Sequence, residues 1–112
     1  MVQKTTKRAN GKQQTQKIIQ QLKKFKKNAH VDKLILFGSA AKGKMTEHSD
    51  IDLVLVSKKF ANKKRYKRPL KLYDFWTLNY PVDFLCYTPE EFEKQKNRIT
   101  IVREAVLDGI EI

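Results

Sequence analysis

Two aspartates at the start of an apolar run are the residues of this chain whose spacing could do chemistry. Asp50 and Asp52 flank Ile51 at the beginning of the stretch "DIDLVLV". Side chains at positions i and i+2 of a strand point to the same face, so these two carboxylates repel each other. A shared proton would relieve the repulsion, and a divalent cation would do so better, because hard oxygen ligands suit Mg²⁺. The spacing therefore predicts a magnesium site.

A Gly-Ser pair upstream supplies the second half of a phosphate site. Protein-bound Mg²⁺ usually keeps positions for water and substrate phosphate, which predicts a phosphate-bearing substrate. Gly38 and Ser39 directly follow an apolar run, where a helical turn would present free backbone N–H groups to an anion. Gly38 permits close approach of the backbone, and the Ser39 hydroxyl can donate to a phosphate oxygen. Lys42 and Lys44 can offset the phosphate charge.

A third carboxylate, Asp83, lies at the start of the apolar run "VDFLCY". If this strand lies beside the strand of Asp50 and Asp52, the three aspartates form a triad. In a two-metal site, one ion activates the attacking hydroxyl and the other stabilises the leaving phosphate. Asp83 would bind the first ion, accept the hydroxyl proton, or both.

Helices and strands must position these residues. Helical periodicity and short apolar runs distinguish the two kinds of element. The predicted helices are residues 15–28, a single turn over 39–42, residues 70–78 started by Pro69, and a helix that begins at Thr88, breaks near Asn97, resumes at Ile101 and ends at Gly109. A capping box of Thr88 and Glu91, with Pro89 in the first turn, begins this last helix. The predicted strands are residues 31–37, 51–56 and 82–87, with an edge strand at 110–112.

This order of elements predicts an α/β or α+β fold, a small mixed sheet with helices packed on it. Residues 1–14 are polar and basic without periodicity, which predicts a mobile basic tail. Residues 15–112 then form one domain. No apolar run is long enough to cross a membrane and no signal peptide is recognisable, so we expect a cytoplasmic protein. The single cysteine, Cys86, is expected to be a buried apolar residue.

Positive charge is concentrated in two segments of a chain of 112 residues with a net charge of +12. Residues 1–28 carry nine Lys or Arg and no acid, and residues 58–71 carry eight and no acid. Such segments attract nucleic acid, nucleotide phosphates or acidic proteins, or they form a solvated surface. Both interpretations stay open from composition alone.

The stretch "GSAAKG", the run "SDIDL" and the later "VD" resemble the motifs of the minimal nucleotidyltransferases of the DNA polymerase beta superfamily. The resemblance covers residues 31–112. It implies the nucleotidyltransferase fold, two Mg²⁺ ions, and transfer of a nucleoside monophosphate from a triphosphate to a hydroxyl with release of pyrophosphate. By position it assigns metal binding and catalysis to Asp50, Asp52 and Asp83, and triphosphate binding to Gly38, Ser39, Lys42 and Ser49.

Small proteins of this kind are often antitoxins that act on a helical HEPN toxin, some by adenylylating a tyrosine. The resemblance therefore implies ATP as donor and a HEPN partner as acceptor. Ala40 and Lys42 stand where arginines are common in the family, and lysine lacks bidentate phosphate geometry. Two alternatives remain: a catalytically weak or inactive antitoxin that masks its partner, and an RNA-binding or RNA-modifying nucleotidyltransferase.

Overall fold

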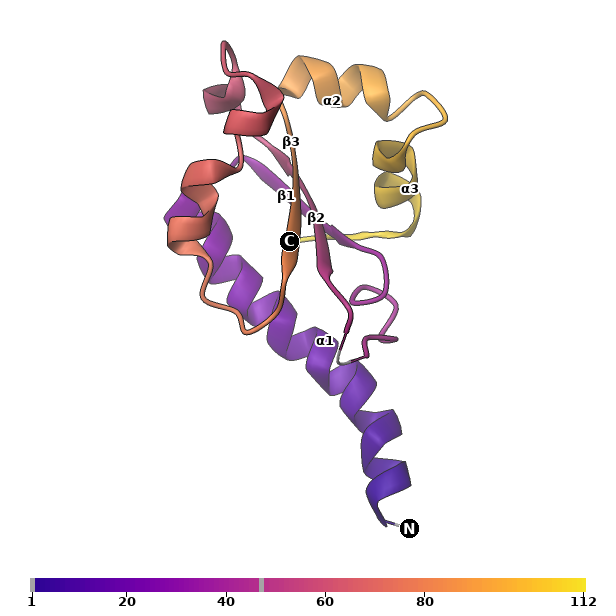
Figure 1. Ribbon diagram of the computed structural model, residues 1–112. Coiled ribbons are helices and arrows are strands. Elements are labelled where there is room, and N and C mark those ends of the chain that lie inside the picture. Colours follow the sequence, from indigo (N-terminus) through magenta and orange to yellow (C-terminus); the bar gives the residue numbers. More distant parts are fainter. Residues whose placement is uncertain (1, 47) are drawn as a thin grey trace.

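A computed structural model describes residues 2–46 and 48–112, and the side chains of 11–46 and 48–112. A long N-terminal helix, a four-stranded sheet and two short helices make up the fold (Figure 1). The elements are α1 (Val2–Ala29), β1 (Lys33–Phe37), β2 (Ile51–Val56), β3 (Val82–Tyr87), α2 (Pro89–Gln95), α3 (Ile101–Asp108) and β4 (Ile110–Glu111), with 3₁₀ helices η1 (Lys58–Phe60), η2 (Arg65–Lys67) and η3 (Leu70–Phe75) between β2 and β3.

The sheet is mixed and has the strand order β3-β2-β1-β4. β1 pairs antiparallel with both β2 and β4, whereas β2 and β3 run parallel. The predicted α/β class, the three main strands and the C-terminal edge strand are confirmed. An antiparallel pair needs only a short connection, but a parallel pair needs a long crossover, here residues 57–81.

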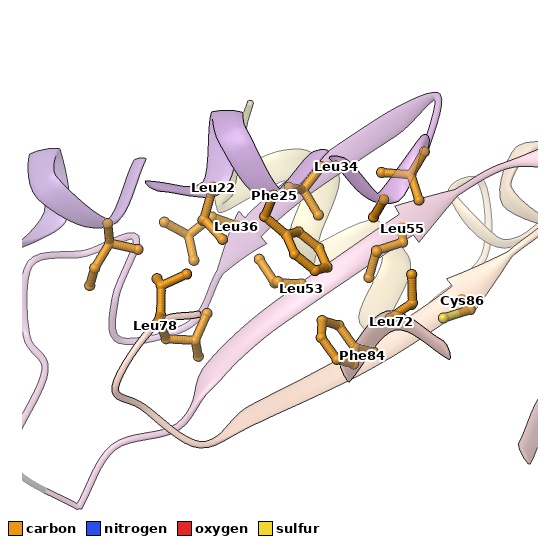
Figure 2. Packing of buried hydrophobic residues seen from close by; sticks show 14 of the residues in the cluster. Leu22, Phe25, Leu34, Leu36, Leu53, Leu55, Leu72, Leu78, Phe84 and Cys86 are labelled. Carbon is orange, nitrogen blue, oxygen red and sulfur yellow. The ribbon is translucent and has the colours of Figure 1, made fainter. Parts of the chain in front are cut away.

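The larger core lies between α1 and one face of the sheet. Leu22 and Phe25 of α1 pack over Leu36, Leu53 and other strand residues, as Figure 2 shows. The Phe25 and Phe84 rings stack with centroids 5.6 Å apart, and the Trp76 ring meets both edge-on. This burial of apolar surface holds the long connection and β3 against α1.

The opposite face of the sheet is covered by α2 and α3. Val54 and Val56 of β2 pack there with Phe92, Val102 and Ala105. Because both faces of β2 are covered, its side chains from Leu53 onward are all buried, which explains the uninterrupted apolar run of its sequence.

Two predicted helices differ in the structure. The first helix begins at Val2 rather than at residue 15, so residues 2–14 are helical; residue 1 lies outside the described residues. Lys, Gln, Arg and Ala are good helix formers even without an apolar face, and this propensity was missed. The predicted helix at 70–78 is instead the 3₁₀ helix η3, in which Leu72 is the one buried side chain and too little apolar surface is covered to hold a longer α-helix.

The predicted strand at 31–37 begins at Lys33 because the end of α1 extends past Ala29. His30 has the left-handed φ of 56°, the Val31 N–H donates to the Lys26 carbonyl, and the His30 N–H donates to the Lys27 carbonyl. These two bonds form a Schellman motif, which takes up Val31, the first residue of the predicted strand. The Asp32 N–H donates to the Val56 carbonyl at 3.0 Å, just before β1 begins.

The capping box of α2 is present as predicted. The Thr88 hydroxyl accepts the Glu91 N–H, and the Glu91 carboxylate accepts the Thr88 N–H. The same carboxylate accepts two hydrogen bonds from Arg68, at 2.6 and 3.2 Å, and Arg68 also donates to the carbonyls of Cys86 and Lys63. Arg68 is buried, so this ion pair ties the long connection to α2 and β3.

Hydrogen bonding from Arg68 lowers the pKa of Glu91 to about 2. A carboxyl with a depressed folded-state pKa stabilises the fold above its unfolded value of 4.5 and loses that stabilisation as pH falls toward 2. We expect Glu91→Gln to unfold at a lower temperature than wild type at pH 7, with the difference shrinking between pH 4.5 and pH 2.

Thermal unfolding followed by circular dichroism at several pH values measures this effect. Glu93→Gln is the matched control, because Glu93 lies on the same helix in an exposed pair with Lys96. Parallel pH profiles for wild type and Glu91→Gln would contradict the assigned role of the Arg68–Glu91 pair.

No helix in the described part of the chain is both long and apolar enough to span a membrane.

Candidate active site

The end of β1 and the starts of β2 and β3 meet at one end of the sheet, which we call the carboxylate rim. In the strand register, Asp52 lies between Phe37 of β1 and Asp83 of β3. The Ile51 N–H donates to the Pro81 carbonyl at 2.9 Å and joins the starts of β2 and β3. Side chains of residues paired in register point to the same face of a sheet, so Asp52 and Asp83 are neighbours as predicted.

The turn after β1 has the hydrogen bonds of a single helical turn. The Lys42 N–H donates to the Gly38 carbonyl, and the Lys44 and Gly43 N–H groups donate to the Ser39 and Ala40 carbonyls. The last two bonds form a second Schellman motif, closed by Gly43 at a φ of 69°. The backbone N–H groups of residues 39–41 donate to no described residue. Ser39 and Ala41 are partly exposed, so their N–H groups can reach an anion, whereas Ala40 is fully buried.

Gly38 and Asp52 are in direct contact. Gly38 has a φ of 76°, and the place where a Cβ would stand is occupied by Oδ2 of Asp52. Only glycine allows the carboxylate to lie against the backbone in this way. The predicted link between the Gly-Ser turn and the aspartates is therefore present as a contact between Gly38 and Asp52.

Electrostatic repulsion is concentrated on Asp52. Burial raises the pKa of the Asp52 carboxyl, and the negative charges of Asp83 and Asp50 raise it further. Asp50 and Asp83 are exposed, whereas Asp52 is partly buried between them. The three carboxylates are thus close enough to interact and carry a net repulsion that a cation would relieve.

Residues of α1 hold the loops on either side of the rim, which sequence reasoning missed. The Thr15 hydroxyl is buried and donates to the Ala40 carbonyl at 2.7 Å, inside the Gly-Ser turn. The Gln14 amide donates to the Tyr80 hydroxyl at 2.6 Å, in the loop that leads to Asp83. Gly11 lies against the carbonyl of Gly43. An isolated Thr in a Lys- and Gln-rich helix gives no sequence signal for such a contact.

The other predicted phosphate-binding residues differ in exposure and in hydrogen bonding. Lys42 is exposed and lines a cavity of about 300 Å³ with residues of α1. The Ser49 hydroxyl accepts the Thr46 N–H at 2.9 Å and so closes its own loop. Ser39 is half-buried, and Ala40, which stands at the usual arginine position, is fully buried in the larger core.

The donor set fits a divalent cation that is completed by other ligands. Among the described side chains, those of residues 11–46 and 48–112, no three His, Cys, Asp or Glu residues form a group that could hold a metal ion. Mg²⁺ needs only one or two protein carboxylates, with waters and phosphate oxygens in the remaining positions. Asp52 and Asp83, adjacent in register, supply such a pair.

Comparison with known proteins agrees with this geometry. Residues 16–108 match the family described as "Nucleotidyltransferase domain", and the chain belongs to this family. It is therefore an enzyme of the nucleotidyltransferase class.

A curated relative and a solved structure resemble the chain. A protein of Methanocaldococcus jannaschii named a putative protein adenylyltransferase is 32% identical over 71 residues, which cover 58% of this chain and 72% of the relative. A crystal structure of a putative nucleotidyltransferase from Sulfolobus solfataricus matches the fold with a TM-score of 0.63 at 19% identity, covering 91% of this chain and 85% of the other. At this low identity, the similarity to the Sulfolobus solfataricus structure supports the fold of this chain alone.

We expect Gly38→Ala to displace the Asp52 carboxylate, since the new methyl group would take its place. Gly43→Ala is the matched control: its φ is also left-handed, but an added Cβ would make only ordinary contacts. Both substitutions should destabilise the fold by about 1–2 kcal/mol. Titration calorimetry should show that Gly38→Ala weakens binding of a nucleoside triphosphate with Mg²⁺ at least tenfold, and that Gly43→Ala weakens it far less. Equal losses would show that the Gly38–Asp52 contact has no special role.

We also expect Asp52→Asn to raise the unfolding temperature at pH 7 without divalent ions. An aspartate with a raised folded-state pKa costs stability once it ionises, so wild type should lose stability as pH rises from 3.8 through the folded value. The stabilisation by Asp52→Asn should therefore be absent at pH 3 and present at pH 7. Asp74→Asn, an exposed carboxylate on η3, controls for the loss of one charge. If Asp52→Asn instead lowered the unfolding temperature at pH 7, the conclusion that burial and neighbouring carboxylates disfavour ionised Asp52 would be wrong.

Proposed function

We propose that this enzyme transfers a nucleoside monophosphate, AMP from ATP, to a hydroxyl group of a partner protein. The observation that supports this best is the place of Asp52, which lies against the Gly38 turn on one side and beside Asp83 on the other. A triphosphate bound to the turn would therefore lie next to the two carboxylates.

In this mechanism the free backbone N–H groups of the turn and the Ser39 hydroxyl hold the triphosphate. Lys42 and Lys44 would balance its charge, and Asp50, Asp52 and Asp83 would hold two Mg²⁺ ions together with water and phosphate oxygens. Nucleotidyltransferase domains generally use divalent metals, and the bound ions would supply charge stabilisation to the phosphates.

Asp83 accepts the proton of the acceptor hydroxyl as that oxygen forms a bond to the α-phosphorus. The bond between the α-phosphorus and the oxygen that bridges it to the β-phosphorus breaks, and pyrophosphate leaves with this bridging oxygen. Asp83 is exposed, so an acceptor side chain can approach it from solvent. Ile51, between Asp50 and Asp52 in the sequence, is fully buried in the larger core and so anchors the start of β2.

The proposed acceptor is a tyrosine of a helical HEPN toxin, which would make the chain an antitoxin. The name of the Methanocaldococcus jannaschii relative supports a protein acceptor in general. The family motifs around Gly38 and Asp52 support the antitoxin role. The second candidate, a masking module without catalysis, predicts protection of the partner without its labelling.

The test is incubation of the chain with ATP labelled on the α-phosphate, Mg²⁺ and the product of the neighbouring gene, which this proposal expects to be a helical protein. We expect label on the partner, and a loss of at least a hundredfold with Asp52→Asn or Asp83→Asn, as for removal of a general base. Asp74→Asn should label at the wild-type rate. Mass spectrometry of the partner locates the modified residue.

Labelling that persists in Asp52→Asn would exclude the proposed site. Absence of any label, together with neutralisation of the partner by both wild type and Asp52→Asn, would favour the masking module.

A further inference from the structure

Many basic side chains gather at the end of the sheet opposite the carboxylate rim. β2 runs from Asp52 to Val56, which at about 3.3 Å per residue carries the chain roughly 13 Å away from the rim. The exposed lysines of residues 58–67 follow directly. In Figure 1 the 3₁₀ helices after β2 lie near the C-terminal end of α1 and away from the loop between β1 and β2.

The two basic segments of the sequence meet at this end. The Lys59 ammonium donates to the Ala29 carbonyl at the end of α1, and the Lys58 N–H donates to the Asp32 carboxylate at 3.4 Å. A cavity of about 450 Å³ is lined by Lys23, Lys26, Lys27, His30, Val31 and Asp32. We call Lys23, Lys26, Lys27 and residues 58–67 the basic end.

Few of these charges are neutralised by the protein itself. Among the described residues, the ion pairs are Arg68–Glu91 and Lys96–Glu93, and neither includes a residue of the basic end. Lys63 and Lys64 are exposed. Burial lowers the pKa of Lys59 and the positive charge of Lys63 lowers it further, while the nearby Asp32 carboxylate opposes this shift. A polyanion bound here would replace repulsion between lysines with attraction.

An exposed aromatic ring, that of Tyr66, lies among these cations. Tyr66 is 66% exposed, and the Lys67 ammonium lies 6.0 Å from the centre of its ring. Tyr66 and Arg65 line a groove of about 300 Å³ beside β3, and the Arg65 guanidinium lies 5.5 Å from the centre of the Tyr87 ring. Aromatic rings and arginine planes flanked by lysines are what an unpaired base and its phosphate require, whereas an acidic peptide has no use for an exposed ring.

We propose that the basic end binds single-stranded nucleic acid, with phosphates on the lysines and a base stacked on Tyr66 in the groove. The site is separate from the carboxylate rim, so binding does not depend on the proposed transfer reaction and should survive in Asp52→Asn. Bound nucleic acid would leave the rim open to ATP and to an acceptor.

The test is fluorescence anisotropy of the full chain with a labelled single-stranded RNA of twelve nucleotides at 50 and 200 mM salt. With three lysine contacts, the affinity should fall about twentyfold between these salt concentrations. Lys63, Lys64 and Lys67 are exposed, so replacing all three with Gln should preserve the fold and weaken binding at 50 mM salt at least tenfold. The matched control replaces Lys94, Arg98 and Arg103 with Gln, which removes the same charge from the exposed surface of the α2–α3 region and should weaken binding less than threefold.

A second variant tests whether the partner of the basic end is a nucleic acid or an acidic protein. Tyr66→Leu keeps all charges and should weaken RNA binding about fivefold or more, while leaving binding of labelled polyglutamate unchanged. Equal losses in the two triple variants would overturn the proposal. So would polyglutamate binding as tight as that of RNA with no effect of Tyr66→Leu, because that result assigns the surface to an acidic protein.

Discussion

The pairing of Asp52 with Asp83 in the parallel register of β2 and β3 is the constraint on which the candidate site depends. Like charges paired side by side destabilise a sheet, and the raised pKa of Asp52 reflects burial together with repulsion from Asp83. The remaining pairs of β2 with β3 are apolar and include Leu53 with Phe84 and Val54 with Leu85. Burial of these pairs offsets the cost of the one acidic pair. The acidic pair lies at the strand ends, where water and a bound cation can reach it.

The parallel pairing that aligns Asp52 with Asp83 also determines where the positive charge lies. A parallel partner for β2 requires the chain to return from the far end of the sheet to the rim, and residues 57–81 make this return. Several lysines of this connection follow directly after β2, at the end of the sheet far from the rim. The Arg68 side chain instead donates to the Glu91 carboxylate. One topological requirement thus separates an acidic end from a basic end by the length of the sheet.

The parts of the fold that could be predicted are those encoded by local patterns. Continuous apolar runs indicated β2 and β3, Thr88 with Glu91 marked the start of α2, and the position of Asp83 at the start of its run anticipated its place beside Asp52. The antiparallel turn after Phe37 then brought Gly38 to Asp52. The bond from Thr15 to Ala40 depends on how α1 crosses the turn, which no local pattern encodes. The same holds for the meeting of the two basic segments through Lys59 and Ala29.

Ala40 shows how this turn would bind phosphate without the arginine usual at its position. Its side chain is fully buried and its carbonyl accepts the Thr15 hydroxyl, so the residue faces α1 and the core. A guanidinium in this place would have to be desolvated or would break the packing of α1 on the turn. Recognition of a triphosphate would then depend on the free backbone N–H groups of the turn. Lys42 and Lys44 would add point charges without the bidentate geometry of arginine. Such a site would bind through the shape of its backbone, which is held by α1 and by Gly43 at the end of the turn.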